Sequence, residues 1–229
     1  MLLALETSTH MLSVALATDR GIIERSAYCA SGGSDRLLPW VQEVLDEAGI
    51  ALADIDAVAF GAGPGSFTGL RLACAAAQGL AYGAGLPVIA IGTLEALAQA
   101  SGTGRIYACL DARMNEVYSA AFEVSADSMI QVMDASVAAP NAVPLPPGRG
   151  WKGCGDGFAT YGEALATRLG SALSTTDPQV PPLACAVAQL AARRWRAGAT
   201  LSPADAAPIY VRDKVALTTA ERLARGGTK

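Results

Sequence analysis

The chain has 229 residues, a formal net charge of −4 at pH 7 and a pI near 5.0. This length allows one large domain or two modest ones, and 17% of charged residues is too few for a disordered chain. The composition also argues against strong nucleic-acid binding, which needs clustered Lys and Arg. The single basic cluster, Arg-Arg-Trp-Arg at 193–196, is equally typical of a solvated helix face.

The cysteines and the first residues indicate a soluble cytoplasmic protein. The five cysteines are scattered and form no CxxC pair, which argues against a zinc ribbon and favours reduced thiols. The opening MLLALETS lacks the basic start of a signal peptide. Residues 72–94 carry no charge, but Pro87 and four glycines interrupt them, so a helix plus a buried strand fits better than a membrane span.

The first hundred residues predict a β-meander followed by alternating helices and strands. Apolar strands are expected before and after a polar turn at residues 7–10, and a third at 22–28. A helix with Gly49 as its C-cap follows, then a buried strand at 55–60, a helix at 70–84 and a strand at 86–91. Thr93 is the expected N-cap of a helix at 94–100. The first lobe is therefore predicted to span residues 1–104.

The remaining chain, residues 105–229, is predicted to form a second, related lobe. Leu110-Asp111 ends its first strand as Leu5-Glu6 ends the opening strand, and a polar turn and a second strand follow in both. A Pro-rich loop at 138–150, two further helices and a strand around 209–212 complete the pattern. Whether the basic C-terminal tail packs back on the first lobe stays open at this stage.

Two copies of a β-meander α/β unit, each with an acid at its hairpin, are typical of the actin-like ATPase (ASKHA, RNase H-like) fold. The sequence therefore predicts an α/β fold of two related lobes with mixed sheets flanked by helices. In that class a nucleotide binds between the halves. Glu6, Thr7, Ser8 and Asp111 are thus candidates for a vestigial nucleotide site, although a fold does not fix a function.

The glycine-rich stretch GAGPGSFTGLR, residues 61–71, matches no phosphate-binding motif. A Walker A loop would need Gly-Lys-Ser/Thr, and Thr68 stands where GxGxxG needs its last glycine. The following helix is rich in Ala and Gly, and each internal glycine costs about 1 kcal/mol relative to alanine. Its small residues serve either tight packing on the chain's own sheet or close contact with a helix of another chain. We interpret the loop and helix as an interface.

The chemistry of an independent enzyme is difficult to build from these residues. His10 is the only histidine, so a His-based metal pair, a Ser-His-Asp triad and a Cys-His pair all lack partners. The sequence therefore predicts no catalytic residue and no intrinsic cofactor. A small actin-like kinase or ATPase that uses Glu6 and Asp111 around magnesium-nucleotide remains an alternative, and a metallopeptidase is the least favoured one.

Several segments, in this order along the chain, resemble the bacterial TsaB (YeaZ) family, which is related to TsaD and the M22 "glycoproteases". They are LLALETSTHMLSVAL, GAGPGSFTGLRLACAAAQGLA, PVIAIGTLEALA, DARMNEVYSAAF and PIYVR. The resemblance implies an actin-like fold and a non-catalytic subunit of the machinery for N6-threonylcarbamoyladenosine (t6A). That machinery modifies adenosine 37 of tRNAs that read ANN codons.

The same resemblance implies partners and a contact surface. The partners are TsaD, which transfers the threonylcarbamoyl group, and the ATPase TsaE, with a homodimer when TsaD is absent. tRNA is reached only through the complex, no membrane is involved, and ATP or ADP would bind at the junction with TsaD. The implied partner-binding residues are Gly65, Ser66, Phe67, Thr68, Gly69, Leu70, Arg71, Ala73, Ala76 and Gly79. Ala73 and Gln78 depart from the glycine and lysine that are frequent in the family.

Overall fold

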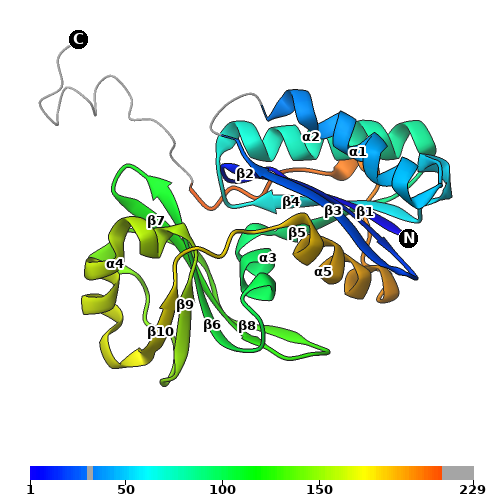
Figure 1. The fold of residues 1–229 in the computed structure, drawn as a ribbon. Helices are drawn as coiled ribbons and strands as arrows, with labels where there is room; N and C mark the ends of the chain where they lie inside the picture. Colours follow the sequence, from blue (N-terminus) through cyan, green and yellow to red (C-terminus); the bar gives the residue numbers. More distant parts are fainter. Residues whose placement is uncertain (30–32, 213–229) are drawn as a thin grey trace, which may run out of the picture.

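Two five-stranded mixed sheets form the fold in the computed structural model, which describes residues 1–29 and 33–212 (Figure 1). The first sheet contains β1 (Leu2–Glu6), β2 (Met11–Thr18), β3 (Gly21–Tyr28), β4 (Ala57–Gly63) and β5 (Val88–Gly92). The second contains β6 (Gly104–Arg113), β7 (Glu116–Val124), β8 (Met129–Ala138), β9 (Trp151–Cys154) and β10 (Leu173–Asp177). The helices are α1 (Ser34–Ala48), α2 (Phe67–Ala84), α3 (Thr93–Ala100), α4 (Asp156–Leu169) and α5 (Ala184–Arg196).

The two sheets have the same topology. Their strand orders are β3-β2-β1-β4-β5 and β8-β7-β6-β9-β10, with three antiparallel strands followed by two parallel ones. The predicted duplication and the actin-like two-lobe fold class are therefore confirmed. All five residues of β1 are buried, which explains why the opening reads as a continuous apolar run rather than an alternating one.

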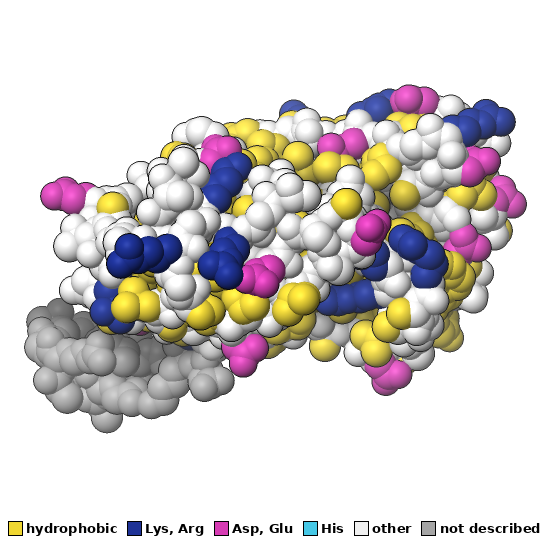
Figure 2. All heavy atoms as spheres, turned by 90° about the horizontal axis from the view of Figure 1, so that it is seen from below, with side chains coloured by type: hydrophobic (Ala, Val, Ile, Leu, Met, Phe, Trp, Pro, Cys, Tyr) yellow, Lys and Arg dark blue, Asp and Glu magenta, His cyan; other side chains and the backbone are white. Residues whose placement is uncertain are grey.

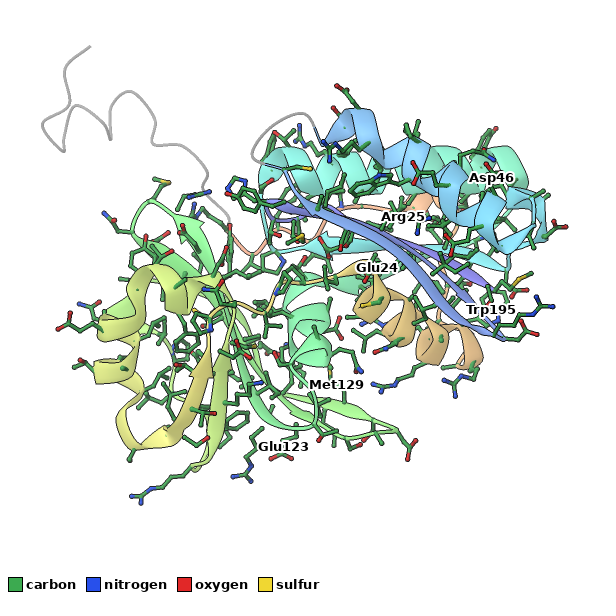
Figure 3. All side chains as sticks on the ribbon, in the orientation of Figure 1. Glu24, Arg25, Asp46, Glu123, Met129 and Trp195 are labelled. Atoms are coloured by element: carbon green, nitrogen blue, oxygen red, sulfur yellow. The ribbon has the colours of Figure 1, made fainter. Side chains whose placement is uncertain are left out.

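Helices cover both faces of each sheet. In the first lobe α1 and α2 lie on one face and α5 on the other (Figure 1). In the second lobe Phe158 and Leu165 of α4 pack on one face, and Leu94 and Leu97 of α3 pack on the other. Met129, at the start of β8, is packed against both lobes (Figure 3). Within the described residues no helix is both long and apolar enough to cross a lipid bilayer.

Helix α5 returns to the first lobe, a possibility that the sequence left open for the C-terminal part of residues 105–229. Val187 and Ala188 of α5 are buried in the core beneath β1 and β2. Two groups of the first sheet cap its start, since Ala184 N–H donates to Ser13 Oγ (2.8 Å) and Cys185 N–H donates to Glu24 Oε1 (2.9 Å; Figure 3). The boundary at residue 104 itself stays a prediction, and residues 213–229 lie outside the described ones.

Replacing Glu24 by glutamine should destabilise the chain by about 1 kcal/mol, because a carboxylate next to a helix N-terminus interacts with the helix dipole and its free N–H groups. Urea denaturation followed by circular dichroism measures the change. The control is Glu163→Gln, an exposed glutamate of α4. If both variants lose the same stability, the charge on Glu24 does not stabilise α5.

Two local predictions about helix starts need correction. Thr93 is the first residue of α3 rather than its N-cap, because the Glu95 carboxylate already accepts the N–H of Gly92 (2.8 Å). The hydroxyl of Thr93 is buried without a hydrogen-bond partner in the described chain. Helix α2 begins at Phe67, earlier than the sequence predicted, because Ser66 Oγ caps it by accepting Gly69 N–H at 3.0 Å.

The strand expected at 209–212 is also wrong. These residues belong to no strand, and their one backbone hydrogen bond among the described residues runs from Ile209 N–H to the carbonyl of Ala62 (2.7 Å). A single bond to the end of β4 anchors the segment without making it a strand. It therefore runs along the junction of the two lobes next to the start of α2.

Candidate functional site

The carboxyl group of Glu6 is enclosed at the end of β1. The residue is 0% exposed, and Oε1 accepts the N–H of Ser8 at 2.6 Å. Oε2 has no hydrogen-bond partner among the described residues and lies against Gly61. Burial raises the pKa of Glu6 to about 7, and the hydrogen bonds from Ser8 and Thr7 only partly oppose this. The carboxyl group therefore faces the interior and not a cavity.

Thr7 and Ser8 hold the β1–β2 turn against the start of α2. Thr7 Oγ1 donates to the carbonyl of Gly69 (2.6 Å), and Ser66 N–H donates to the carbonyl of Ser8 (2.7 Å). A Cβ atom at Gly69 would lie 1.9 Å from the backbone carbonyl oxygen of Thr7. Thr7 and Ser8 thus have structural roles, and glycine is needed at position 69 for this close approach.

The second hairpin brings charged groups to the junction between the lobes. Asp111 N–H donates to Asp156 Oδ1 (2.9 Å), and the Asp111 carboxylate pairs with Arg113 (3.2 Å). Across the junction, Nη2 of Arg113 lies 2.8 Å from Nε2 of His10. Burial raises the pKa of Asp156. These four side chains, with Tyr28, line a cavity of about 410 Å³.

The four candidates for a vestigial nucleotide site do not share one cavity. Ser8 and Asp111 line a small cavity of about 120 Å³, whereas Glu6 and Thr7 do not reach it. In the part of the chain that the structure describes, no group of three or more His, Cys, Asp or Glu side chains could hold a metal ion. Glu6 and Asp111, the two acids of the kinase alternative, therefore do not line this cavity together.

Helix α2 has two faces of small residues with different surroundings. Ala73, Ala77 and Ala81 are buried against the first sheet. The opposite face, which we call the outer stripe, is exposed and consists of Thr68, Arg71, Ala75, Gly79 and Tyr82. Nothing lies within 4 Å of a Cβ atom built at Gly79, so this glycine is not explained by packing within the described chain. The alanines serve the chain's own core, and the glycine leaves room outside it.

The implied partner-binding residues fall into three groups. Ser66, Phe67, Thr68, Arg71 and Gly79 are exposed, and Gly65 and Ala76 are half-buried. Gly69, Leu70 and Ala73 are buried in the chain by itself. The assignment of these ten residues to a partner contact stays a prediction; in the chain itself, Gly69 and Ala73 position α2 on the turn and the sheet.

Arg71 is held by aromatic side chains at the start of α2. Its guanidinium lies 3.6 Å from the ring centroid of Phe67, and its Nε donates to the hydroxyl of Tyr210 (3.3 Å). A cation over an aromatic face is attracted by the ring's negative potential, which opposes the unfavourable interaction of Arg71 with the helix N-terminus.

Charged side chains of both signs lie on the face of the molecule that Figure 2 shows. On the face in Figure 2, basic and acidic side chains are interspersed and do not gather into one basic surface. The arginines of α5 contact the chain itself: Arg194 pairs with Glu95 (2.8 Å), and Arg193 donates to the carbonyl of Ala126 (3.1 Å). The solvated-helix interpretation therefore fits only Trp195 and Arg196, which are exposed, whereas Arg193 and Arg194 are half-buried and bonded within the chain.

Comparison with known proteins decides the family. The chain is 34% identical to the tRNA threonylcarbamoyladenosine biosynthesis protein TsaB of Escherichia coli K12, over 94% of this chain and 96% of the relative. The corresponding protein of Haemophilus influenzae is 35% identical, over 93% and 94%. The chain belongs to the TsaB family. The solved structure of YeaZ from Pseudomonas aeruginosa, at 36% identity, superposes with a TM-score of 0.85 over 91% of this chain and 98% of that one.

The TsaB-family chain also matches a wider family. Residues 26–152 match the family model of TsaD, described as a tRNA N6-adenosine threonylcarbamoyltransferase. The match begins in β3 and ends in β9, so it covers elements of both lobes.

Sequence reasoning missed two parts of the surface of this TsaB-family chain. Tyr82, which is 82% exposed, ends the outer stripe, and the spacing of residues 68, 71, 75, 79 and 82 could have revealed it. The segment 209–212 lies beside Phe67 only because the chain returns to the first lobe, and Tyr210 is 139 residues from its partner Arg71. No local signal indicates such a contact.

Proposed function

We propose that this chain is a non-catalytic subunit of the cytoplasmic machinery that makes t6A in tRNA. It binds a TsaD-type transferase, TsaE joins the assembly, and tRNA is reached only through the complex. The names of the E. coli and H. influenzae relatives support a role in t6A biosynthesis. The match to the TsaD family model supports a partner with a related fold, because related lobes can pair through equivalent surfaces.

The outer stripe of α2 is the observation on which the partner-binding proposal rests. It runs for about 21 Å along the helix, at 1.5 Å per residue. Its middle is small, with Ala75 and Gly79, and exposed aromatic side chains stand at its ends: Phe67 is 48% exposed and Tyr82 is 82% exposed. Small residues allow two helices to approach closely, and aromatic side chains are frequent anchors of interfaces.

The same stripe can pair with itself. In an antiparallel pair of α2 helices centred on Ala75, Gly79 of one chain would face Arg71 of the other, and Tyr82 would face Thr68. An interface of this kind is isologous and closes after two copies. We therefore propose a homodimer that exchanges for a mixed complex when TsaD is present.

The proposal assigns no cofactor to the isolated chain. The burial of Glu6 and the absence of Thr7 from the cavities described above support this assignment. ATP or ADP, when the assembly holds it, is proposed to bind at the junction with TsaD.

Replacing Ala75 by arginine should weaken both the homodimer and the complex with cognate TsaD by at least about tenfold, because a long charged side chain separates the helices. Light scattering after size exclusion, on the chain alone and mixed with TsaD, measures both. Ala75 is exposed, so the fold should tolerate the change, and Ala166→Arg on the exposed face of α4 is the matched control. A wild-type chain that stays monomeric and does not bind TsaD contradicts the proposal.

A further inference from the structure

A groove at the junction of the two lobes lies beside the start of the outer stripe. Its volume is about 270 Å³, and its walls are mostly apolar. Phe67 and Leu70 of α2 form one wall, Met114 and Tyr118 of the second hairpin form the opposite one, and residues 209–212 border both. Phe67 lines this groove and also stands at the N-terminal end of the outer stripe, so the groove and the stripe are continuous.

The tip of the second hairpin has an unfavourable backbone conformation. Arg113, Met114 and Asn115 have φ values of 60°, 57° and 59°, in the left-handed region that residues other than glycine seldom adopt. Residues in such strained conformations occur frequently at binding sites. The turn holds Met114 at the rim of the groove with 64% of its surface exposed. Methionine adapts its shape to a partner more readily than branched side chains do.

Arg71 stands at the edge of this groove with donors to spare. Stacking on Phe67 occupies one face of the Arg71 guanidinium, and the bond to Tyr210 uses its Nε. No carboxylate of the described residues pairs with Arg71, whereas Arg113 pairs with Asp111 and Arg212 with Glu116. The guanidinium is therefore oriented in advance, with its two terminal nitrogens available to a carboxylate.

The size and the apolar walls of the groove suit a protein side chain. At about 270 Å³ the groove lies at the lower end of the usual volumes of small-ligand pockets, about 300–1,000 Å³. One large apolar side chain would fill much of it, in the way that buried anchors fill pockets at protein interfaces.

We propose that the groove receives one apolar side chain of the TsaD-type partner, and that an Asp or Glu next to that side chain pairs with Arg71. The identity of the partner rests on the proposed function. The groove would give the complex a contact that the antiparallel pairing of two α2 helices does not supply, and thereby distinguish the transferase from a second copy of the chain.

Calorimetric titration of the full chain with purified cognate TsaD tests the two contacts. Arg71→Gln should weaken binding about tenfold and reduce its salt dependence, whereas Arg20→Gln, at the exposed β2–β3 turn, should change neither. Met114→Asp should weaken binding more than tenfold, because it removes apolar surface and repels the partner's carboxylate. Met114→Asn is the uncharged match, because Asn and Asp both tolerate the left-handed conformation. It should weaken binding less than Met114→Asp, since it does not repel the partner's carboxylate.

Photo-crosslinking identifies the occupant. With p-benzoylphenylalanine in place of Met114 and TsaD present, we expect adducts on one TsaD segment that has an apolar residue beside Asp or Glu. Adducts on residues 213–229 of the same chain, or on a second copy, overturn the inference. The inference is also overturned if Arg71→Gln and Met114→Asp both bind TsaD with wild-type affinity while Ala75→Arg no longer binds it. In that case the proposed function stands. A wild-type chain that does not bind TsaD overturns both.

Discussion

Replacing Gly69 by alanine is expected to destabilise the chain by about 3 kcal/mol or more, a large effect for one methyl group. The new Cβ would lie 1.9 Å from the carbonyl oxygen of Thr7, and both atoms belong to constrained backbone. Helix α2 would have to move away from the β1–β2 turn, which breaks the 2.6 Å bond from Thr7 to the carbonyl of Gly69. Urea denaturation measures the free energy of unfolding.

Gly79→Ala is the matched control, since it is the same substitution in the same helix. Its Cβ would meet nothing within 4 Å, so the higher helix propensity of alanine should stabilise the chain by about 0.5–1 kcal/mol. We therefore expect opposite signs at positions 69 and 79. A neutral Gly69→Ala variant would contradict the close approach of α2 to the turn.

The two-lobed fold could be predicted because its signals are local and occur twice. Leu5-Glu6 and Leu110-Asp111 each end an apolar strand before a polar turn, and β1 and β6 occupy equivalent central positions in the two sheets. The return of α5 to the first sheet could not be predicted in this way. Its buried alanines would suit either lobe, and only contacts such as that of Ser13 with Ala184 decide between them.

The candidate surface could be predicted as a helix but not as a face of that helix. Small residues occur on both sides of α2, at 73, 77 and 81 and at 75 and 79. Hydrophobic periodicity therefore does not indicate which face of α2 is buried, because alanine and glycine differ little in their tendency to be buried. The position of the sheet assigns the first set to the core. The groove depends on contacts between distant parts of the chain, such as that of Arg71 with Tyr210.

Replacing Glu6 by glutamine should remove a pH dependence of stability. The pKa of Glu6 is about 7 in the folded chain and 4.5 is its ordinary value, so between these values the folded state keeps a proton that the unfolded state releases. Wild-type stability should therefore be highest below about pH 4.5 with respect to this group, fall as the pH rises to 7, and stay level above. One unit of pKa corresponds to about 1.4 kcal/mol, so the fall is about 3 kcal/mol.

The glutamine variant should match the wild type below about pH 4.5 and exceed it by about 1–3 kcal/mol at pH 8. Glutamine can still accept the N–H of Ser8 through its oxygen. Urea denaturation at a series of pH values measures the difference, and Glu163→Gln on the exposed face of α4 should leave the slope unchanged. A slope that persists in Glu6→Gln would assign the titration to another group.

The outcome also bears on the ancestry of the site. A nucleotide-binding acid that acts through magnesium must be ionised and reach solvent, whereas Glu6 is enclosed and binds its proton more tightly than an ordinary carboxyl group. If glutamine stabilises the chain above pH 7 and binding to TsaD is unchanged, the carboxyl group is a remnant whose charge costs stability without serving the interface. If binding to TsaD is lost while stability rises, the acid has kept a role in the assembly, because a purely structural remnant would not affect the partner.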